Sequence, residues 1–137
     1  MPKWKPAQSL GGKMERAEKI LRQFYGYKAF RQAQAPVVKS LLAGRDTCAI
    51  MPTGAGKSIC FQIPALLMDG LTIVVSPLIS LMKDQVDALI GQGIPATYIN
   101  SSLSPDEADR RADNIRTGQT KLLYLAPEKL EGSYFRR

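Results

Sequence analysis

Hydrophobic residues recur at helical spacing in two segments near the amino terminus. Between residues 13 and 25 they occur every three or four positions, at Met14, Ala17, Ile20, Leu21 and Phe24, and Gly26 follows. This spacing predicts an amphipathic helix that ends at the glycine. A second helix is predicted over residues 33–43, with Pro36 in its first turn and Gly44 beyond its end.

From residue 47 onward, short apolar runs alternate with helical patterns. The runs cover residues 47–51, 71–76, 96–100 and 121–125, and helices are predicted over 57–68, 79–91 and 105–116. The last of these helices starts with a capping box, Ser104-Pro-Asp-Glu107. Pro64 should bend the first of them and leave residues 65–68 as a second short piece. Strands that alternate with helices predict an α/β fold, a parallel sheet with helices on both faces.

The composition is that of an ordinary globular chain. With 137 residues, 45% apolar and 23% charged, the chain has the size of one domain, and general disorder and collagen are excluded. The absence of histidine excludes His-dependent catalysis and ordinary zinc sites. No apolar run suits a membrane span or a signal peptide. Cys48 and Cys60 lie inside apolar segments. A reduced cytoplasmic location is therefore expected.

The positive charge is concentrated at the amino terminus. Residues 1–31 hold eight basic and two acidic residues, or +6, whereas the other 106 residues hold eleven basic and ten acidic residues, or +1. Residues 1–12, rich in proline and glycine, are predicted to form a flexible basic arm. A basic segment is compatible with a polyanionic partner, although such charges are also common on a solvated helix face.

A glycine-rich segment, Met51-Pro-Thr-Gly-Ala-Gly-Lys-Ser58, lies between a predicted strand and a predicted helix. Backbone N–H groups in such a loop, together with the helix N-terminus, bind phosphate. Lys57 would reach the terminal phosphates, and the Ser58 hydroxyl would ligate Mg²⁺. The usual phosphate-loop pattern has glycine where this chain has Met51. The alternative is a glycine-rich turn with an incidental lysine.

Three other segments carry side chains suited to nucleotides or nucleic acids. Residues 25–34 combine aromatic rings, a guanidinium and carboxamides, which can stack on a base or pair with the adenine edge, although each residue alone also fits a structural role. Residues 76–85 and 126–129 follow two predicted strands, at the sheet edge where ligands bind in parallel sheets. Their donors suit phosphates, but both are also ordinary strand-to-helix connections.

Taken together, these segments resemble the RecQ family of DNA helicases over residues 17–130. The similar stretches are Phe-Arg-Gln-Ala-Gln (30–34), Met-Pro-Thr-Gly-Ala-Gly-Lys-Ser (51–58), Val-Ser-Pro-Leu-Ile-Ser-Leu-Met-Lys-Asp-Gln (75–85) and Tyr-Leu-Ala-Pro-Glu-Lys-Leu (124–130). The family also has methionine at the head of the loop. The resemblance implies a P-loop NTPase (RecA-like) fold and an ATP-dependent enzyme that moves 3′ to 5′ on DNA, with roles in DNA repair and recombination.

The resemblance also implies roles for individual residues. Tyr27 and Arg31 would sandwich adenine and Gln34 would hydrogen-bond it. The phosphates would be held by Thr53, Gly54, Ala55, Gly56, Lys57 and Ser58, of which Lys57 and Ser58 would also be catalytic and Ser58 would ligate Mg²⁺. Single-stranded or forked DNA would contact Ser76, Pro77, Lys83, Gln85, Pro127, Glu128 and Lys129. The implied location is the cytoplasm, at a bacterial nucleoid, with neither zinc nor a membrane partner.

One family motif is missing. RecQ helicases have an Asp-Glu-Ala-His segment whose acids handle Mg²⁺ and the attacking water. This chain lacks it, and its only Asp-Glu pair is Asp106-Glu107. The chain therefore resembles the N-terminal part of a first motor domain, without the strands that would flank the phosphate-loop strand, and unpaired apolar edges and aggregation are expected. The alternatives are a non-catalytic nucleotide- or DNA-binding module and a decayed, truncated product.

Overall fold

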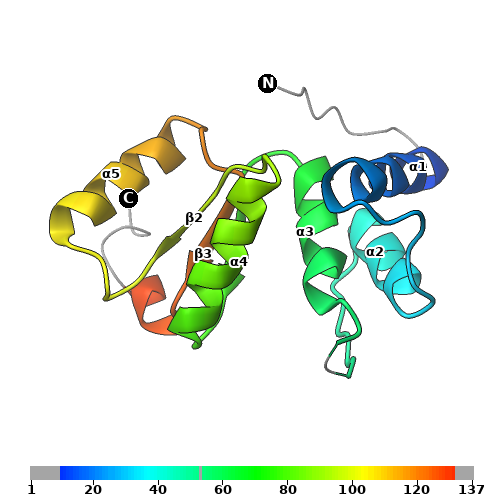
Figure 1. Ribbon diagram of the computed structural model, residues 1–137, viewed down its shortest axis with the longest axis horizontal. Coiled ribbons are helices and arrows are strands. Elements are labelled where there is room, and N and C mark those ends of the chain that lie inside the picture. The colour runs from blue at the N-terminus through cyan, green and yellow to red at the C-terminus, as the bar shows by residue number, and fades with distance from the viewer. Residues whose placement is uncertain (1–9, 53, 132–137) are drawn as a thin grey trace. The chain divides into compact units, whose positions relative to one another are not determined.

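The computed structural model describes residues 10–52 and 54–131. The chain divides into two compact units, Met1–Asp69 and Gly70–Arg137, and each is described by itself. The first unit is helical, and the second contains the sheet (Figure 1).

Three helices pack against one another in the first unit. They are α1 (Leu10–Ile20), which continues into the π-helical turn η1 (Leu21–Tyr25), α2 (Gln34–Leu42) and α3 (Lys57–Leu67). The two predicted amino-terminal helices are thereby confirmed, and the first ends at Gly26, whose φ is 74°. It begins at Leu10, so the predicted arm is wrong for residues 10–12, which are helical. Residues 1–9 lie outside the described residues.

Helix α3 runs through Pro64 as one element. The prediction of a second short piece over residues 65–68 is therefore wrong. Proline removes one backbone hydrogen bond from a helix interior. Here every residue from 62 to 67 is buried, and this packing of apolar side chains offsets the lost bond. The Pro64 carbonyl still accepts a hydrogen bond from the N–H of Met68, at 3.1 Å, so the helix ends in regular geometry.

The strand predicted over residues 47–51 is not present. Within the described parts of the chain, no segment pairs with it, and residues 43–50 are all exposed, Ile50 to 95%. A β-strand is stabilised by a hydrogen-bonded neighbour, so the apolar run alone does not make one. The segment is tied to α2 by a 2.8 Å hydrogen bond between the hydroxyls of Ser40 and Thr47.

The second unit is a three-stranded parallel sheet with two crossover helices. Its elements are β1 (Thr72–Val75), α4 (Ile79–Gly91), β2 (Ala96–Ile99), α5 (Pro105–Arg116), β3 (Leu122–Leu125) and the 3-10 turn η2 (Pro127–Glu131). The strand order is β1-β3-β2. The two crossovers run in opposite directions along the sheet, and right-handed crossovers then put α4 and α5 on opposite faces. This confirms the predicted parallel α/β arrangement.

Helix α5 has the predicted start and covers one face of the sheet. The hydroxyl of Ser104 accepts the N–H of Glu107 at 3.2 Å, and Pro105 occupies the first turn. Ile115 of α5 packs on a buried cluster made of Ile99, Leu123 and Leu125. The capping box therefore positions a helix whose apolar side seals the sheet.

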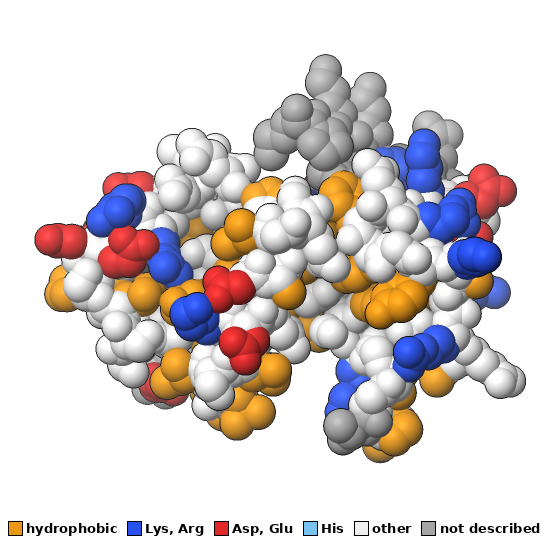
Figure 2. Space-filling view, viewed as in Figure 1, with side chains coloured by type: hydrophobic (Ala, Val, Ile, Leu, Met, Phe, Trp, Pro, Cys, Tyr) orange, Lys and Arg blue, Asp and Glu red, His pale blue; other side chains and the backbone are white. Residues whose placement is uncertain are grey.

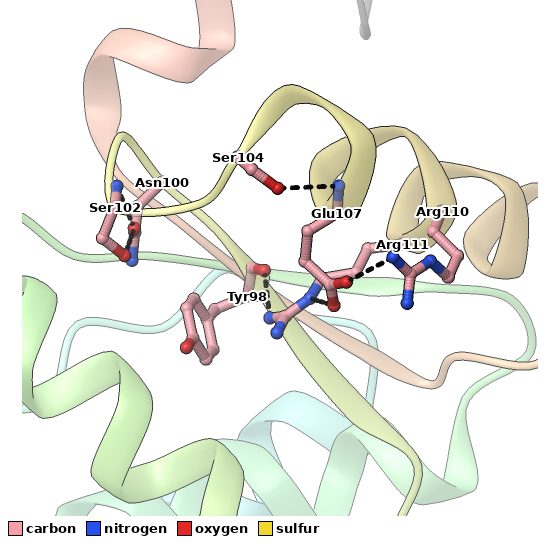
Figure 3. A network of polar contacts seen from close by, with 7 residues as sticks. All are labelled: Tyr98, Asn100, Ser102, Ser104, Glu107, Arg110 and Arg111. Atoms are coloured by element: carbon pink, nitrogen blue, oxygen red, sulfur yellow. Dashed lines mark hydrogen bonds and ion pairs between the residues drawn. The ribbon is translucent and has the colours of Figure 1, made fainter.

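The two edges of the sheet differ. At β2, the Arg111 guanidinium donates to the carbonyl of Tyr98 at 2.9 Å, lies 4.4 Å from the centre of the Tyr98 ring, and pairs with Glu107 (Figure 3). A charged side chain on an edge carbonyl blocks further strand pairing. At β1, the parallel ladder turns the N–H and C=O groups of Ile73 and Val75 away from β3. Their side chains are apolar and 42% and 48% exposed, and no strand in the described part of the chain pairs with this edge.

No helix among the described residues is long and apolar enough to cross a membrane.

Candidate functional site

The predicted phosphate loop, residues 51–56 before α3, ends in the geometry that a helix N-terminal anion site requires. Helix α3 begins at Lys57, directly after Gly56, whose φ of 78° lies in the left-handed region. The N–H of Ala55 bonds the Pro52 carbonyl at 3.2 Å and forms the turn before it. The first N–H groups of α3 are free of intrahelical acceptors and point toward this loop. Thr53 lies outside the described residues.

Gln34 joins the segment predicted to bind adenine to this loop. Its side chain is 3% exposed, its Oε1 accepts the N–H of Arg31 at 2.8 Å, and its Nε2 donates to the Gly56 carbonyl at 3.2 Å. A Cβ on residue 56 would lie 2.3 Å from Gln34 Nε2. Glycine is therefore required at this position both for its φ angle and for the space that Gln34 occupies.

A second contact joins the same two segments. The Nη1 atom of Arg31 donates to the Gly54 carbonyl at 2.7 Å. Tyr27, Arg31, Gln34, Gly54 and Gly56 line one pocket of about 290 Å³, together with Ala29 and Ile59. This volume is at the lower end of small-molecule pockets, about 300 Å³, and suits a flat ring. The structure thus brings together the three predicted adenine-binding residues and two glycines of the phosphate loop.

The two residues with predicted catalytic roles follow the loop. Lys57 is exposed and lines a neighbouring apolar pocket of about 290 Å³, with Met51 and Phe61 among its walls. Ser58 is half-buried in the first turn of α3. Cys60, one turn further, is buried and donates to the Gly56 carbonyl at 3.7 Å; burial raises the pKa of its thiol.

The predicted DNA-contacting residues lie in the second unit, after two paired strands. Ser76 and Pro77 follow β1, and Pro127, Glu128 and Lys129 follow β3. The strands are parallel neighbours, so both segments lie at the carboxyl edge of the sheet. Pro77, Pro127 and Glu128 are exposed, and Ser76 and Lys129 are half-buried. The hydroxyl of Ser76 accepts the N–H of Leu78 at 3.2 Å.

Lys83 and Gln85 lie further along, in α4. The Nζ atom of Lys83 is 2.6 Å from Asp87, and this ion pair raises the pKa of Lys83. Lys83 and Asp87 are both more than half exposed, so the pair is weak and open to competition from another anion. Gln85 is half-buried. Figure 2 shows acidic and basic side chains intermingled over α4 and α5, so this face of α4 is not uniformly basic.

Sequence reasoning gave no role to Asn100 and did not predict the contact between Tyr25 and Gln62. Asn100, at the carboxyl end of β2, is 2% exposed, and its Oδ1 accepts the N–H of Ser102 at 2.9 Å (Figure 3). The polar run after the third predicted strand, Asn100-Ser-Ser102, was the available signal. The hydroxyl of Tyr25 donates to Oε1 of Gln62 at 2.9 Å. No spacing rule connects these two residues, which lie 37 positions apart.

Among the described residues, no group of three or more acidic or cysteine side chains could hold a metal ion. Glu107, from the only Asp-Glu pair, pairs instead with Arg110 and Arg111. The hydrogen bond from Arg111 keeps the pKa of Glu107 below its ordinary value.

A model of the DEAD/DEAH box helicase family matches residues 31–137. The chain belongs to this family. The fold agrees, because three parallel strands flanked by helices form part of a RecA-like sheet.

Curated relatives agree with the resemblance to RecQ. The ATP-dependent DNA helicase RecQ of Bacillus subtilis (strain 168) is 50% identical over 125 residues, which is 90% of this chain and 21% of the relative. That of Haemophilus influenzae is 48% identical over 116 residues, covering 85% and 19%. That of Synechocystis is 51% identical over 113 residues, covering 82% and 24%. The expected similarity to RecQ helicases is confirmed, and the chain spans about a fifth of the length of these relatives.

Proposed function

We propose that this chain is the nucleotide-binding part of a RecQ-type, ATP-dependent 3′–5′ DNA helicase, and that it binds an adenine nucleotide and single-stranded DNA. The observation that carries the proposal is the joining of the base pocket to the phosphate loop. Arg31 and Gln34 each hydrogen-bond a glycine carbonyl of that loop. Base and phosphates of one nucleotide would then be held by one continuous set of residues.

The side chain of Gln34 retains the atoms needed to recognise adenine. A carboxamide offers two acceptor lone pairs and two N–H donors. One lone pair accepts the Arg31 N–H and one N–H donates to Gly56. The remaining lone pair would accept the adenine N6 amine, and the remaining N–H would donate to N7. Tyr27 and Arg31, which line the same pocket, would stack on the two faces of the base.

The phosphates would lie over the start of α3. Backbone N–H groups of Gly54 and Gly56 and the helix N-terminus would bind the oxygens, and Lys57 would neutralise the terminal phosphates. The N–H of Ala55 is occupied by the Pro52 carbonyl, so Ala55 would shape the loop between these donors. Thr53 would belong to the same loop. Mg²⁺ would be held by the Ser58 hydroxyl and the nucleotide oxygens, where it supplies neutralisation of phosphate charge. In hydrolysis, Lys57 would stabilise charge on the transferred phosphate.

DNA would be bound at the carboxyl edge of the sheet in the second unit. Ser76, Pro77, Lys83 and Gln85 after β1, and Pro127, Glu128 and Lys129 after β3, would contact the backbone of single-stranded or forked DNA. Such contacts position a strand without reading its sequence. The two units would belong to one RecA-like domain of a longer helicase in the cytoplasm, at the nucleoid in a bacterium. Because the Asp-Glu-Ala-His acids are absent, these 137 residues alone would not unwind DNA.

The test is ATP binding to the purified chain in the presence of Mg²⁺, measured by calorimetry. Saturable one-to-one binding is expected, with a loss of at least tenfold in Lys57→Ala. Lys39→Ala is the matched control, because Lys39 is an exposed lysine in α2 of the same unit. Equal affinities of both variants would contradict the proposal, as would absence of binding by a folded chain.

The alternative is a non-catalytic module that binds DNA without nucleotide. The observation that favours it is the net charge of +6 over residues 1–31. DNA binding that ignores ATP and survives Lys57→Ala would support this alternative.

A further inference from the structure

The base-binding loop is anchored differently at its two ends. It runs from Gly26 to Arg31, between η1 and α2. At its far end, Arg31 and Gln34 hold it to the phosphate loop by hydrogen bonds of 2.7 to 3.2 Å. At its near end, beside Gly26, Tyr27 is 52% exposed, and it is one of the two residues that would stack on the base. The position of Tyr27 therefore depends on the contacts that hold the end of the loop beside Gly26.

The contact at the near end comes from Tyr25, the last residue of the π-helical turn η1. Its hydroxyl donates to Oε1 of Gln62 at 2.9 Å. Gln62 is 4% exposed and belongs to α3, the helix that the phosphate loop opens. A hydrogen bond to a buried side chain on a helix restricts the position of the start of the loop relative to that helix. The π-helical geometry is itself a local departure that recurs near functional sites.

We infer that Tyr25 is a positioning residue of the nucleotide site, which fixes the base-binding loop to the phosphate-binding helix through Gln62. This inference rests on the proposed nucleotide binding and deepens it. Tyr25 would act through Tyr27, two residues later, and would not touch the nucleotide. Removal of its hydroxyl should therefore weaken binding of the base and spare binding of the phosphates.

The experiment compares Tyr25→Phe with the unaltered 137-residue chain, using two probes. For ADP, the dissociation constant is expected to rise about three- to tenfold, which is the effect of one hydrogen bond. For inorganic tripolyphosphate, which has no base, it should change by less than about twofold. Tyr98→Phe is the matched control, because it removes a tyrosine hydroxyl in the other unit. It should change neither constant.

A second measurement separates positioning from general destabilisation. In a Tyr27→Ala background, Tyr25→Phe should have no further effect on ADP binding, because the residue through which it acts is gone. Equal losses for ADP and tripolyphosphate, or a full loss in the Tyr27→Ala background, would overturn the inference and indicate a structural role only. An unchanged ADP constant would overturn it also. Absence of ADP binding by the unaltered chain would overturn the proposed function first, and this inference with it.

Discussion

The substitution Gly56→Ala is predicted to damage the nucleotide site in two separable ways. Residue 56 has a φ of 78°, which L-amino acids adopt at a cost of about 1–2 kcal/mol. Its new Cβ would also lie 2.3 Å from Gln34 Nε2 and would displace that side chain. Gln34 would then lose its hydrogen bonds to Arg31 and Gly56, each with a net value of about 0.5–1.5 kcal/mol. The free energy of unfolding should fall by about 2–5 kcal/mol in total.

The chain offers a control that carries only the first of these costs. Gly54 has a φ of 84°, and a Cβ there would meet nothing within 4 Å. Gly54→Ala should therefore lower the free energy of unfolding by only about 1–2 kcal/mol. The assay is urea denaturation followed by circular dichroism, with ATP affinity measured in parallel. Both variants should be compared in a Gln34→Ala background, where the clash at residue 56 disappears.

In that background, the two glycine substitutions should become equally destabilising. The difference between them in the unaltered background, about 1–3 kcal/mol, is the contribution of Gln34. Equal destabilisation by Gly54→Ala and Gly56→Ala with Gln34 intact would refute the reasoning, because it would mean that Gln34 is not held against Gly56.

Three further predictions concern the second unit. Asp87→Asn should free Lys83 and raise the affinity for single-stranded DNA, by at most about fivefold, as measured by fluorescence anisotropy; an unchanged or weaker affinity would exclude Lys83 from the DNA contacts. The hydrogen bond from Arg111 lowers the pKa of Glu107, so this pair stabilises the folded state at pH values above the unfolded-state pKa of Glu107, near 4.5. The stabilisation is lost as the pH falls through the lower pKa of Glu107 in the folded state. The melting temperature of Glu107→Gln should accordingly be lower than that of the unaltered chain near neutral pH and become equal to it only in strong acid. The same difference in melting temperature at every pH would contradict this. Ile73→Lys should reduce self-association in sedimentation experiments, because a lysine disfavours strand pairing at the β1 edge. Unchanged self-association would mean that copies of the chain associate through another surface.

Elements with local signals were predictable from the sequence. Helix α5 forms over the predicted residues because Ser104 and Pro105 fix its start within one turn. Helix α4 likewise matches its apolar spacing. The run over residues 47–51 has a strand-like composition but is not a strand, because strand formation needs a partner that local sequence does not supply.

The candidate site was predictable by residue type and not by contact. The spacing of Gly56, Lys57 and Ser58 predicts a loop before a helix, which the structure has. The bond between Gln34 and Gly56 and that between Tyr25 and Gln62 join residues 22 and 37 positions apart. Contacts of this kind depend on how α1, α2 and α3 pack, and no periodicity in the sequence encodes them.

The central claim is that the base pocket and the phosphate loop form one adenine-nucleotide site. The most direct test is calorimetric titration of the chain with ATP and with GTP in Mg²⁺, repeated for Gln34→Ala. Because guanine presents an acceptor where adenine presents its N6 amine, the account predicts that ATP binds at least tenfold more tightly and that Gln34→Ala removes the preference. Equal affinity for ATP and GTP in the unaltered chain would contradict it.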